Sequence, residues 1–137
     1  MKQILELKEP VGTILKSVDL FNKIKKINID YSQENVLIFC LDTKNKIIDT
    51  EIMFKGGLNS CVFDIKTIFR KSLIKNSNSI IIAHNHPSGD LTPSLEDNEV
   101  SYKLKEAGKV ITLKVLDFII FNKNEFYTVE GLKENTA

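Results

Sequence analysis

The sequence predicts an α/β fold, a mixed central sheet flanked by helices, and three observations lead to this prediction. The chain has 137 residues, which suits one compact domain. Hydrophobic residues make up 42% of it, enough to fill a core. Helix-like and strand-like segments follow one another in the order α-β-β-α-β-α-β-β, and this order packs naturally as a sheet covered by helices.

Three segments have apolar residues at the spacing of an amphipathic helix. The first is expected to begin at Ser17 as its cap, and the second at Asp64. The third is expected to begin near Pro93, after Thr92 as its cap, and to end at Gly108. The apolar positions that define these helices are Leu20, Ile24 and Ile27; Ile65, Ile68, Phe69 and Leu73; and Val100 and Leu104.

Five segments predict strands. Residues 35–41 and 46–54 are expected to pair as a hairpin through the turn at 42–45, and Gly56-Gly57 ends the second strand. The run SIIIAHNH is continuously apolar before its histidines, which is typical of a strand buried on both faces. The remaining strand segments are VITLKVLDFIIF, as one long strand or a bent pair, and residues 125–130.

The composition argues against several classes of protein. Nineteen basic and 18 acidic residues give a net charge of +1, so the whole chain has no electrostatic preference for nucleic acid, although a local patch is left open. No apolar run reaches the length of a membrane span, and the charged start does not resemble a secretory signal. Two cysteines, Cys40 and Cys61, are too few for a disulfide framework. We therefore expect a cytoplasmic protein with reduced cysteines.

The strongest functional pattern joins the chain's two histidines to one aspartate. Side chains two residues apart on a strand point to the same side, so His84 and His86 are expected to do so. Asp97 shares a helix face with Val100 and Leu104, which should look inward. A buried carboxylate is strongly unfavourable unless it is paired or ligates a metal. These three side chains therefore predict a metal site.

Two other interpretations apply to the same residues. Ser94-x-x-Asp97 also matches a helix capping box, and His-Asn-His could simply begin a polar loop. The convergence of three donors favours the metal site. Two histidines and one aspartate favour zinc, with iron and manganese as alternatives, and leave a fourth position for water.

A hydrolytic metal site also needs a general base. Glu51 lies on the second predicted strand, and Asp49, two residues away, shares its face. Spacing alone does not choose between them, and an exposed strand carboxylate is the simpler interpretation of either one.

The spacing His84-x-His86, seven residues, Ser94, two residues and Asp97 matches the JAMM (JAB/MPN) metalloprotease motif. The run HNHPSGD more particularly resembles the bacterial RadC family, as do EIMFKGGLNS and KEAGKVITLKVLDFII. The likeness extends over about residues 34–131, and the whole chain, 1–137, is expected to be a single RadC-like domain.

This resemblance implies a fold, a cofactor and a role for each site residue. The implied fold is the cytidine-deaminase-like three-layer sandwich. His84, His86 and Asp97 match the ligands of one zinc ion. Glu51 matches the general acid/base, and Ser94 matches the serine that stabilises the oxyanion. The implied activity is zinc-dependent hydrolysis of a peptide or isopeptide amide, with a protein or peptide as substrate and no membrane partner.

The sequence departs from the family pattern at three places. The family's N-terminal helix-hairpin-helix region is expected to be absent, which weakens any direct binding of DNA. Phe118 follows Leu116-Asp117 where the family has histidine, and Ile65-Lys66 replaces Pro-Arg. The alternatives are a DNA-repair-associated RadC-like protein and a non-catalytic interaction module stabilised by zinc.

Overall fold

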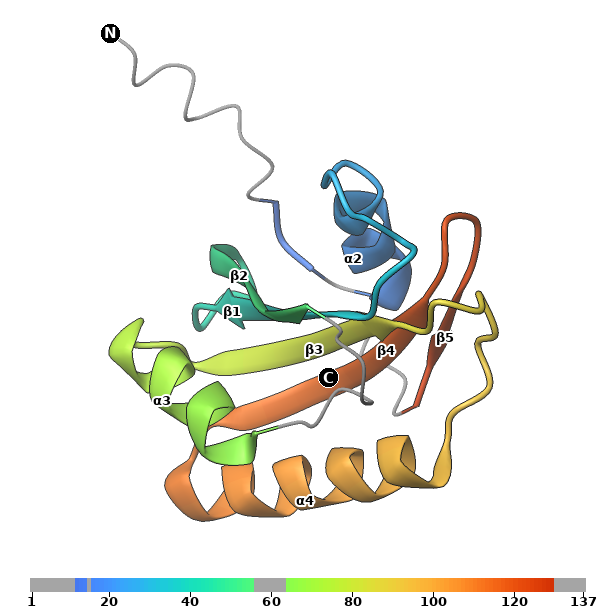
Figure 1. Cartoon of the computed structure of the whole chain (residues 1–137). Helices are drawn as coiled ribbons and strands as arrows, with labels where there is room; N and C mark the ends of the chain where they lie inside the picture. Colours follow the sequence, from blue (N-terminus) through green and yellow to red (C-terminus); the bar gives the residue numbers. More distant parts are fainter. Residues whose placement is uncertain (1–11, 15, 56–63, 130–137) are drawn as a thin grey trace, which may run out of the picture.

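The computed structural model describes residues 12–14, 16–55 and 64–129, and it shows a five-stranded mixed sheet with helices on both faces (Figure 1). The predicted order of helices and strands is confirmed. The elements are α2 Ser17–Ile24, β1 Asn35–Leu41, β2 Ile47–Lys55, α3 Ile65–Ile74, β3 Ser79–Asn85, α4 Leu95–Ile111, β4 Lys114–Phe121 and β5 Phe126–Thr128. Gly56-Gly57 and Cys61 lie outside the described residues, whereas Cys40 is buried as a free thiol.

The strands lie in the order β2-β1-β3-β4-β5. The predicted hairpin is confirmed, because β1 pairs antiparallel with β2, and β1 also pairs antiparallel with β3. Strands β3 and β4 are parallel, joined by the crossover through α4. This parallel unit places the start of α4 near the end of β3 at which the two histidines lie. None of the helices in the described part of the chain has both the length and the apolar character needed to cross a bilayer.

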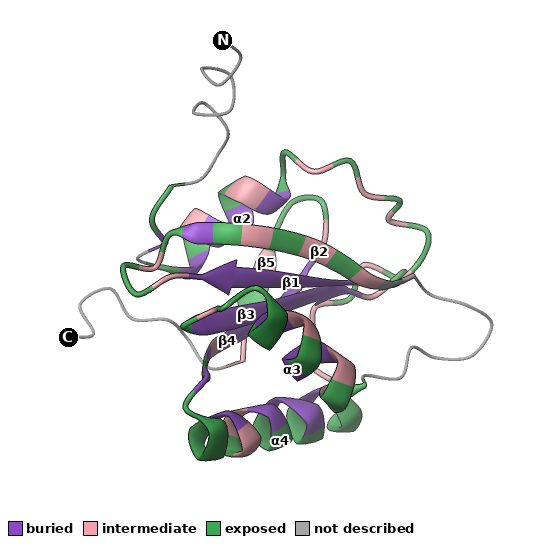
Figure 2. Cartoon of the chain, turned by 90° about the vertical axis from the view of Figure 1, so that its left-hand side faces the viewer, coloured by how far each residue is buried: buried purple, intermediate pink, exposed green. Residues whose placement is uncertain are grey.

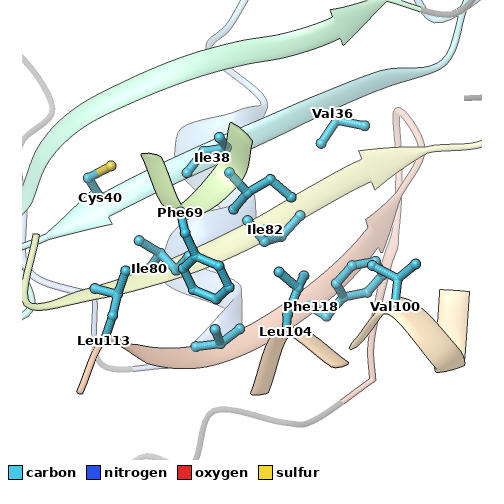
Figure 3. Close-up of a cluster of buried hydrophobic side chains, with 12 residues drawn as sticks. Val36, Ile38, Cys40, Phe69, Ile80, Ile82, Val100, Leu104, Leu113 and Phe118 are labelled. Carbon is cyan, nitrogen blue, oxygen red and sulfur yellow. The ribbon is translucent and has the colours of Figure 1, made fainter. Parts of the chain in front are cut away.

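The sheet separates two hydrophobic cores, which gives the three layers that the sequence predicts (Figures 1 and 2). Strand β1 contributes to both, because its side chains alternate between the faces. The core beneath α3 and α4, part of which Figure 3 shows, consists of Val36, Ile38, Cys40, Ile68, Phe69, Ile80, Ile82, Val100, Leu104, Leu113, Val115 and Phe118. The core beneath α2 consists of Ile14, Leu20, Phe21, Ile24, Leu37, Phe39, Leu41, Ile47, Ile81, Ala83, Ile119 and Phe121.

The first helix begins differently from its prediction. Lys16 is the N-cap, and Ser17 is a buried residue inside the helix. Its hydroxyl donates a hydrogen bond of 2.7 Å to the buried carboxylate of Asp117 on β4. The hydroxyl of Ser17 thus binds an acid far away in the sequence and does not cap the helix, so the expectation of a serine cap was wrong. The helix ends at Ile24, so Ile27 lies beyond it.

The second helix confirms its predicted cap but not its whole buried face. Asp64 accepts a hydrogen bond of 3.2 Å from the backbone N–H of Thr67. Leu73, expected to face the core, is 51% exposed, while Ser72 beside it is buried and donates to the carbonyl of Ile68. In the last turn of α3 the buried position is therefore occupied by the small polar residue Ser72, and Leu73 faces the solvent.

The third helix runs past its predicted end. Gly108 lies inside α4, which continues to Ile111 and ends at Thr112 in the left-handed conformation, with φ of 56°. A Cβ atom at position 108 would lie 2.3 Å from the carbonyl oxygen of Leu113. Glycine is therefore needed for a close approach of the returning chain rather than for capping. The strand predicted from VITLKVLDFIIF begins only at Lys114, because the first residues of that segment belong to the end of α4.

Candidate metal centre

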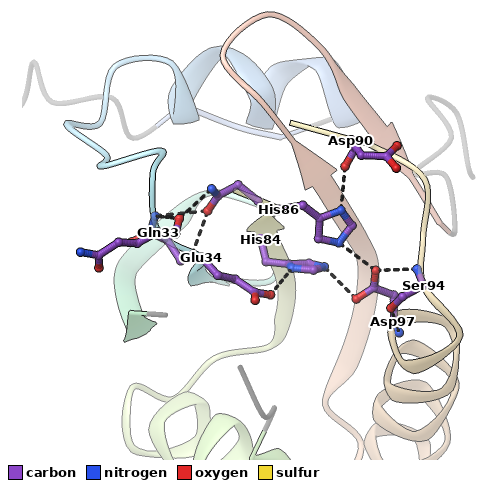
Figure 4. Close-up of polar contacts among 9 residues, drawn as sticks. Gln33, Glu34, His84, His86, Asp90, Ser94 and Asp97 are labelled. Carbon is purple, nitrogen blue, oxygen red and sulfur yellow. Dashed lines mark hydrogen bonds and ion pairs between the residues drawn. The ribbon is translucent and has the colours of Figure 1, made fainter. Parts of the chain in front are cut away.

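The two histidines and Asp97 meet where β3 ends and α4 begins (Figure 4). His84 is a buried residue near the end of β3, and His86 follows the strand directly. Asp97 lies in the first turn of α4 and is only 2% exposed. The structure therefore brings together the three side chains in which the sequence predicts a metal site.

The donor atoms are close enough to share one ion. Asp97 Oδ1 lies 3.0 Å from His84 Nε2, and Asp97 Oδ2 lies 3.1 Å from His86 Nε2. One ligand atom from each residue can be chosen so that all lie within 4.8 Å of one another. In a tetrahedral zinc site with bonds near 2 Å, neighbouring donors are about 3.3 Å apart. The three residues could therefore hold a metal ion after small adjustments.

Asp97 is held by the helix that carries it. The backbone N–H of Ser94 donates to Asp97 Oδ2 at 2.8 Å, and the backbone N–H of Asp97 donates to Ser94 Oγ at 2.9 Å. Ser94 is the N-cap, so the expectation that Thr92 caps and that Pro93 is the first helical residue was wrong. The capping box and the histidine cluster, which the sequence presents as alternatives, exist together and use the same carboxylate.

The three side chains also shift one another's pKa values. Burial works against a charged Asp97, yet hydrogen bonds from His84 and His86 hold the pKa of its carboxyl well below the usual range. Burial likewise disfavours a charged His84, but its hydrogen bonds to Asp97 and Glu34 prevail and raise its pKa. The hydrogen bond to Asp97 also raises the pKa of His86. Charge in the cluster thus favours a carboxylate facing cationic partners, and a metal cation could serve in that place.

The ring of His86 is oriented from its far side. Its Nδ1 lies 2.6 Å from the backbone carbonyl of Asp90. A carbonyl can only accept, so Nδ1 carries the hydrogen, and in the neutral ring Nε2 is the nitrogen whose lone pair can bind a metal. Hydrogen bonds of this kind fix the tautomer of metal-binding histidines.

Glu34 is a member of the site that the sequence reasoning missed. Its Oε2 lies 3.1 Å from His84 Nδ1. Its place follows from strand geometry once the register of β1 against β3 is known. Alternation along β1 puts Glu34 on the face of Val36, and Val36 pairs directly with His84. Continuing that antiparallel register by two residues brings Glu34 opposite His86.

Glu51, the general base suggested by the resemblance, lies on the same face but elsewhere. Glu51 lies on β2, where it pairs with Ile38 of β1. Because β1 lies between β2 and β3, Glu51 is two strand spacings, about 10 Å, from β3. Its carboxylate lies 3.2 Å from Lys71 Nζ on α3. Burial opposes the charge on Glu51, but the hydrogen bond from Lys71 holds its pKa below the usual value. The contacts recorded among described residues join Glu51 to this lysine and to Asp49, not to the histidines.

Phe118 fills the place of the histidine usual in the family. Its buried ring lies 5.4 Å from the His84 ring, centroid to centroid. This side of His84 is therefore apolar, and the polar partners of its ring are Asp97 and Glu34.

Fold and site together define a three-layer α/β domain with a candidate His-His-Asp metal centre beside its central strand. A family model described as the RadC-like JAB domain matches residues 14–135. The chain belongs to this family, as its resemblance predicts.

Several curated relatives of this chain are named UPF0758 protein. A UPF0758 protein of Clostridium perfringens is 45% identical over 98 residues, which are 72% of this chain and 43% of the relative. One from Staphylococcus haemolyticus is 42% identical over 97 residues, 71% of this chain and 42% of the relative. One from Chlorobium chlorochromatii is 36% identical over 115 residues, 84% of this chain and 52% of the relative. The chain thus spans about half the length of the curated relatives it matches.

Proposed function

We propose that this domain is a zinc-dependent hydrolase that cleaves a peptide or isopeptide amide. The observation that carries the proposal is the convergence of three metal donors, His84, His86 and Asp97 (Figure 4). A fourth polar side chain, Glu34, contacts the buried imidazole of His84. His84, His86 and Asp97 would hold the ion. When bound, zinc would polarise the amide carbonyl and lower the pKa of a water molecule to about 7.

Glu51 is the general base in this proposal, on the strength of the family resemblance. It would accept a proton from the attacking water and return it to the amine that leaves. Glu34 has a different role, because it contacts His84 Nδ1, whereas Nε2 of the same ring faces Asp97, so Glu34 orients this ligand. Ser94 has a second role. Its oxygen accepts a hydrogen bond from the backbone of Asp97, which leaves its hydroxyl hydrogen available to donate to the developing oxyanion. One such donor typically contributes about 10²–10³ in rate.

Glu34 is the competing candidate for the base, because its carboxylate lies beside the donor cluster. The isosteric pair Glu34→Gln and Glu51→Gln separates the two assignments. Zinc content is measured first, and cleavage of a peptide library second. We expect both variants to retain zinc, and only Glu51→Gln to lose cleavage, by about 10²-fold or more. The opposite pattern would assign the role to Glu34, and no cleavage by the zinc-loaded parent would contradict the hydrolase proposal itself.

A non-catalytic module stabilised by zinc is the second candidate, because Asp97 both caps α4 and belongs to the donor set. A bound ion would then tie α4 to β3 without any reaction. In this case Glu51→Gln leaves cellular function unchanged, whereas His86→Ala abolishes it. The DNA-repair alternative has no comparable support, since the net charge is only +1; a DNA affinity that falls steeply with salt would favour it.

A further inference from the structure

A cavity of about 420 Å³ opens beside the candidate metal centre. His86 is shared by the metal centre and the cavity, because its ring contacts Asp97 and the residue also lines the cavity. The remaining walls come from the loop before β1, at Tyr31 and Ser32, and from the turn between β4 and β5, around Lys123. The cavity is therefore placed to receive a group that is attached close to the reacting bond.

The walls of this cavity are fixed by hydrogen bonds. Asn122 Nδ2 donates to the carbonyl of Gly89 at 3.0 Å, which ties the β4–β5 turn to the turn after β3. Asn122 Oδ1 accepts from the backbone N–H groups of Asn124 and Glu125 at 2.8 and 2.7 Å. The backbone N–H of Gly89 donates to the carbonyl of His86 at 2.8 Å. Such a cavity exists before any ligand arrives, so little ordering is needed on binding.

The charge of the lining is one-sided. Apart from His86, Lys123 is the residue of the lining that carries a charge at neutral pH, and no carboxylate belongs to the lining. Its Nζ lies 5.7 Å from the centre of the Tyr31 ring, and that ring packs edge-on against Phe121 at 5.9 Å. Among the residues described, no ion pair is recorded for Lys123, so its charge is available to a ligand.

Two acids that neighbour lining residues of the cavity already accept hydrogen bonds. Asp30, next to Tyr31, accepts hydrogen bonds from the backbone N–H and the hydroxyl of Ser32. Asp90, on the far side of His86, accepts from the backbone N–H of Thr92. Both acids are exposed and screened by water, whereas Lys123 borders the cavity itself.

We propose that this cavity binds a carboxylate of the substrate and that Lys123 is the residue that selects it. The inference rests on the proposed hydrolase function and adds a substrate class to it, namely amides with a carboxylate near the cleaved bond. An acidic side chain and a free C-terminus offer the same chemistry, and the test separates them.

The test uses binding, so that it does not depend on turnover. The zinc-loaded chain is titrated with short peptide hydroxamates, whose hydroxamate ligates the metal. The set compares glutamate with glutamine in the peptide, and a free with an amidated C-terminus. We expect the carboxylate that fits to bind about two- to fivefold more tightly than its neutral counterpart, as for an exposed ion pair, with the preference fading at high salt.

Lys123→Glu should remove or reverse this preference, and Lys123→Gln should remove it. Lys103→Glu is the matched control, because Lys103 is an exposed lysine on α4 that does not line the cavity, and it should leave the preference intact. Equal affinity for all four hydroxamates, failure of the acidic ones to bind, or an unchanged preference in Lys123→Glu would overturn the inference. A preference that depends on Lys123, without cleavage of any peptide, would support the site while contradicting the hydrolase.

Discussion

Asn85 clamps the backbone on both sides of Glu34. Its Oδ1 accepts from the backbone N–H of Asn35 at 2.8 Å, and its Nδ2 donates to the carbonyl of Gln33 at 2.9 Å. Asn85 is the residue between the two histidines and is itself buried. The tripeptide His84-Asn85-His86, at the end of β3, therefore supplies two candidate ligands, and its asparagine positions Glu34, which contacts one of them.

Asn85→Ala tests this clamp. The substitution leaves a buried N–H and a carbonyl without their partner, which should lower the free energy of unfolding by about 1–3 kcal/mol. We also expect zinc affinity to fall, and amide cleavage with it, because Glu34, which orients the candidate ligand His84, moves. Urea denaturation, zinc titration and peptide cleavage measure the three effects. Asn28→Ala, at an exposed loop position, is the control; an unchanged zinc affinity in Asn85→Ala would argue against a positioning role.

Asp97→Asn should uncouple the cluster while keeping the shape of the side chain. An amide oxygen can still accept from the backbone N–H of Ser94, so the helix start should largely survive. His84 and His86, however, lose the negative charge that they face. We expect zinc content below one ion per chain, measured by metal analysis after dialysis, with helical circular dichroism retained. Full zinc occupancy in this variant would remove Asp97 from the ligand set.

Metal removal should change stability as well as chemistry. A ligand that binds only the folded state stabilises it by about 2.7 kcal/mol at one hundred times its dissociation constant. We expect zinc to raise the melting temperature of chelator-treated protein, and His86→Ala to abolish the increase. Magnesium, which prefers oxygen ligands in octahedral geometry, should have little effect. A melting temperature that zinc does not change would contradict the site.

Local periodicity was enough to predict most of this site. The i, i+2 spacing of a strand put the two histidines on one side, and the i, i+3, i+7 spacing of a helix turned Asp97 inward. Glu34 was missed because its place depends on the pairing of β1 with β3, two segments about fifty residues apart. The register of an antiparallel pair cannot be predicted from the sequence of either strand alone.

Element ends were missed for a related reason. Ser17 and Gly108 have the residue types of helix caps, but each is determined by a partner from another part of the chain, Asp117 and Leu113 respectively. Local propensity could not distinguish a serine that caps its own helix from one that satisfies a buried acid. Ser94 and Asp97, whose capping bonds are local, already match a capping box in the sequence, although it was considered there only as an alternative to the metal site.

Gly108→Ala offers the sharpest test of the close contact behind α4. In an ordinary helix interior, alanine is more stable than glycine by about 1 kcal/mol. Here the added Cβ would lie 2.3 Å from the carbonyl oxygen of Leu113, a backbone atom that cannot simply turn aside. We therefore expect destabilisation by about 1–3 kcal/mol, the usual range for overpacking, in urea denaturation. Gly89→Ala is the comparison, since no atom lies within 4 Å of its added Cβ and only its φ of 86° opposes the change. A more stable Gly108→Ala protein would show that the chain after α4 can move away.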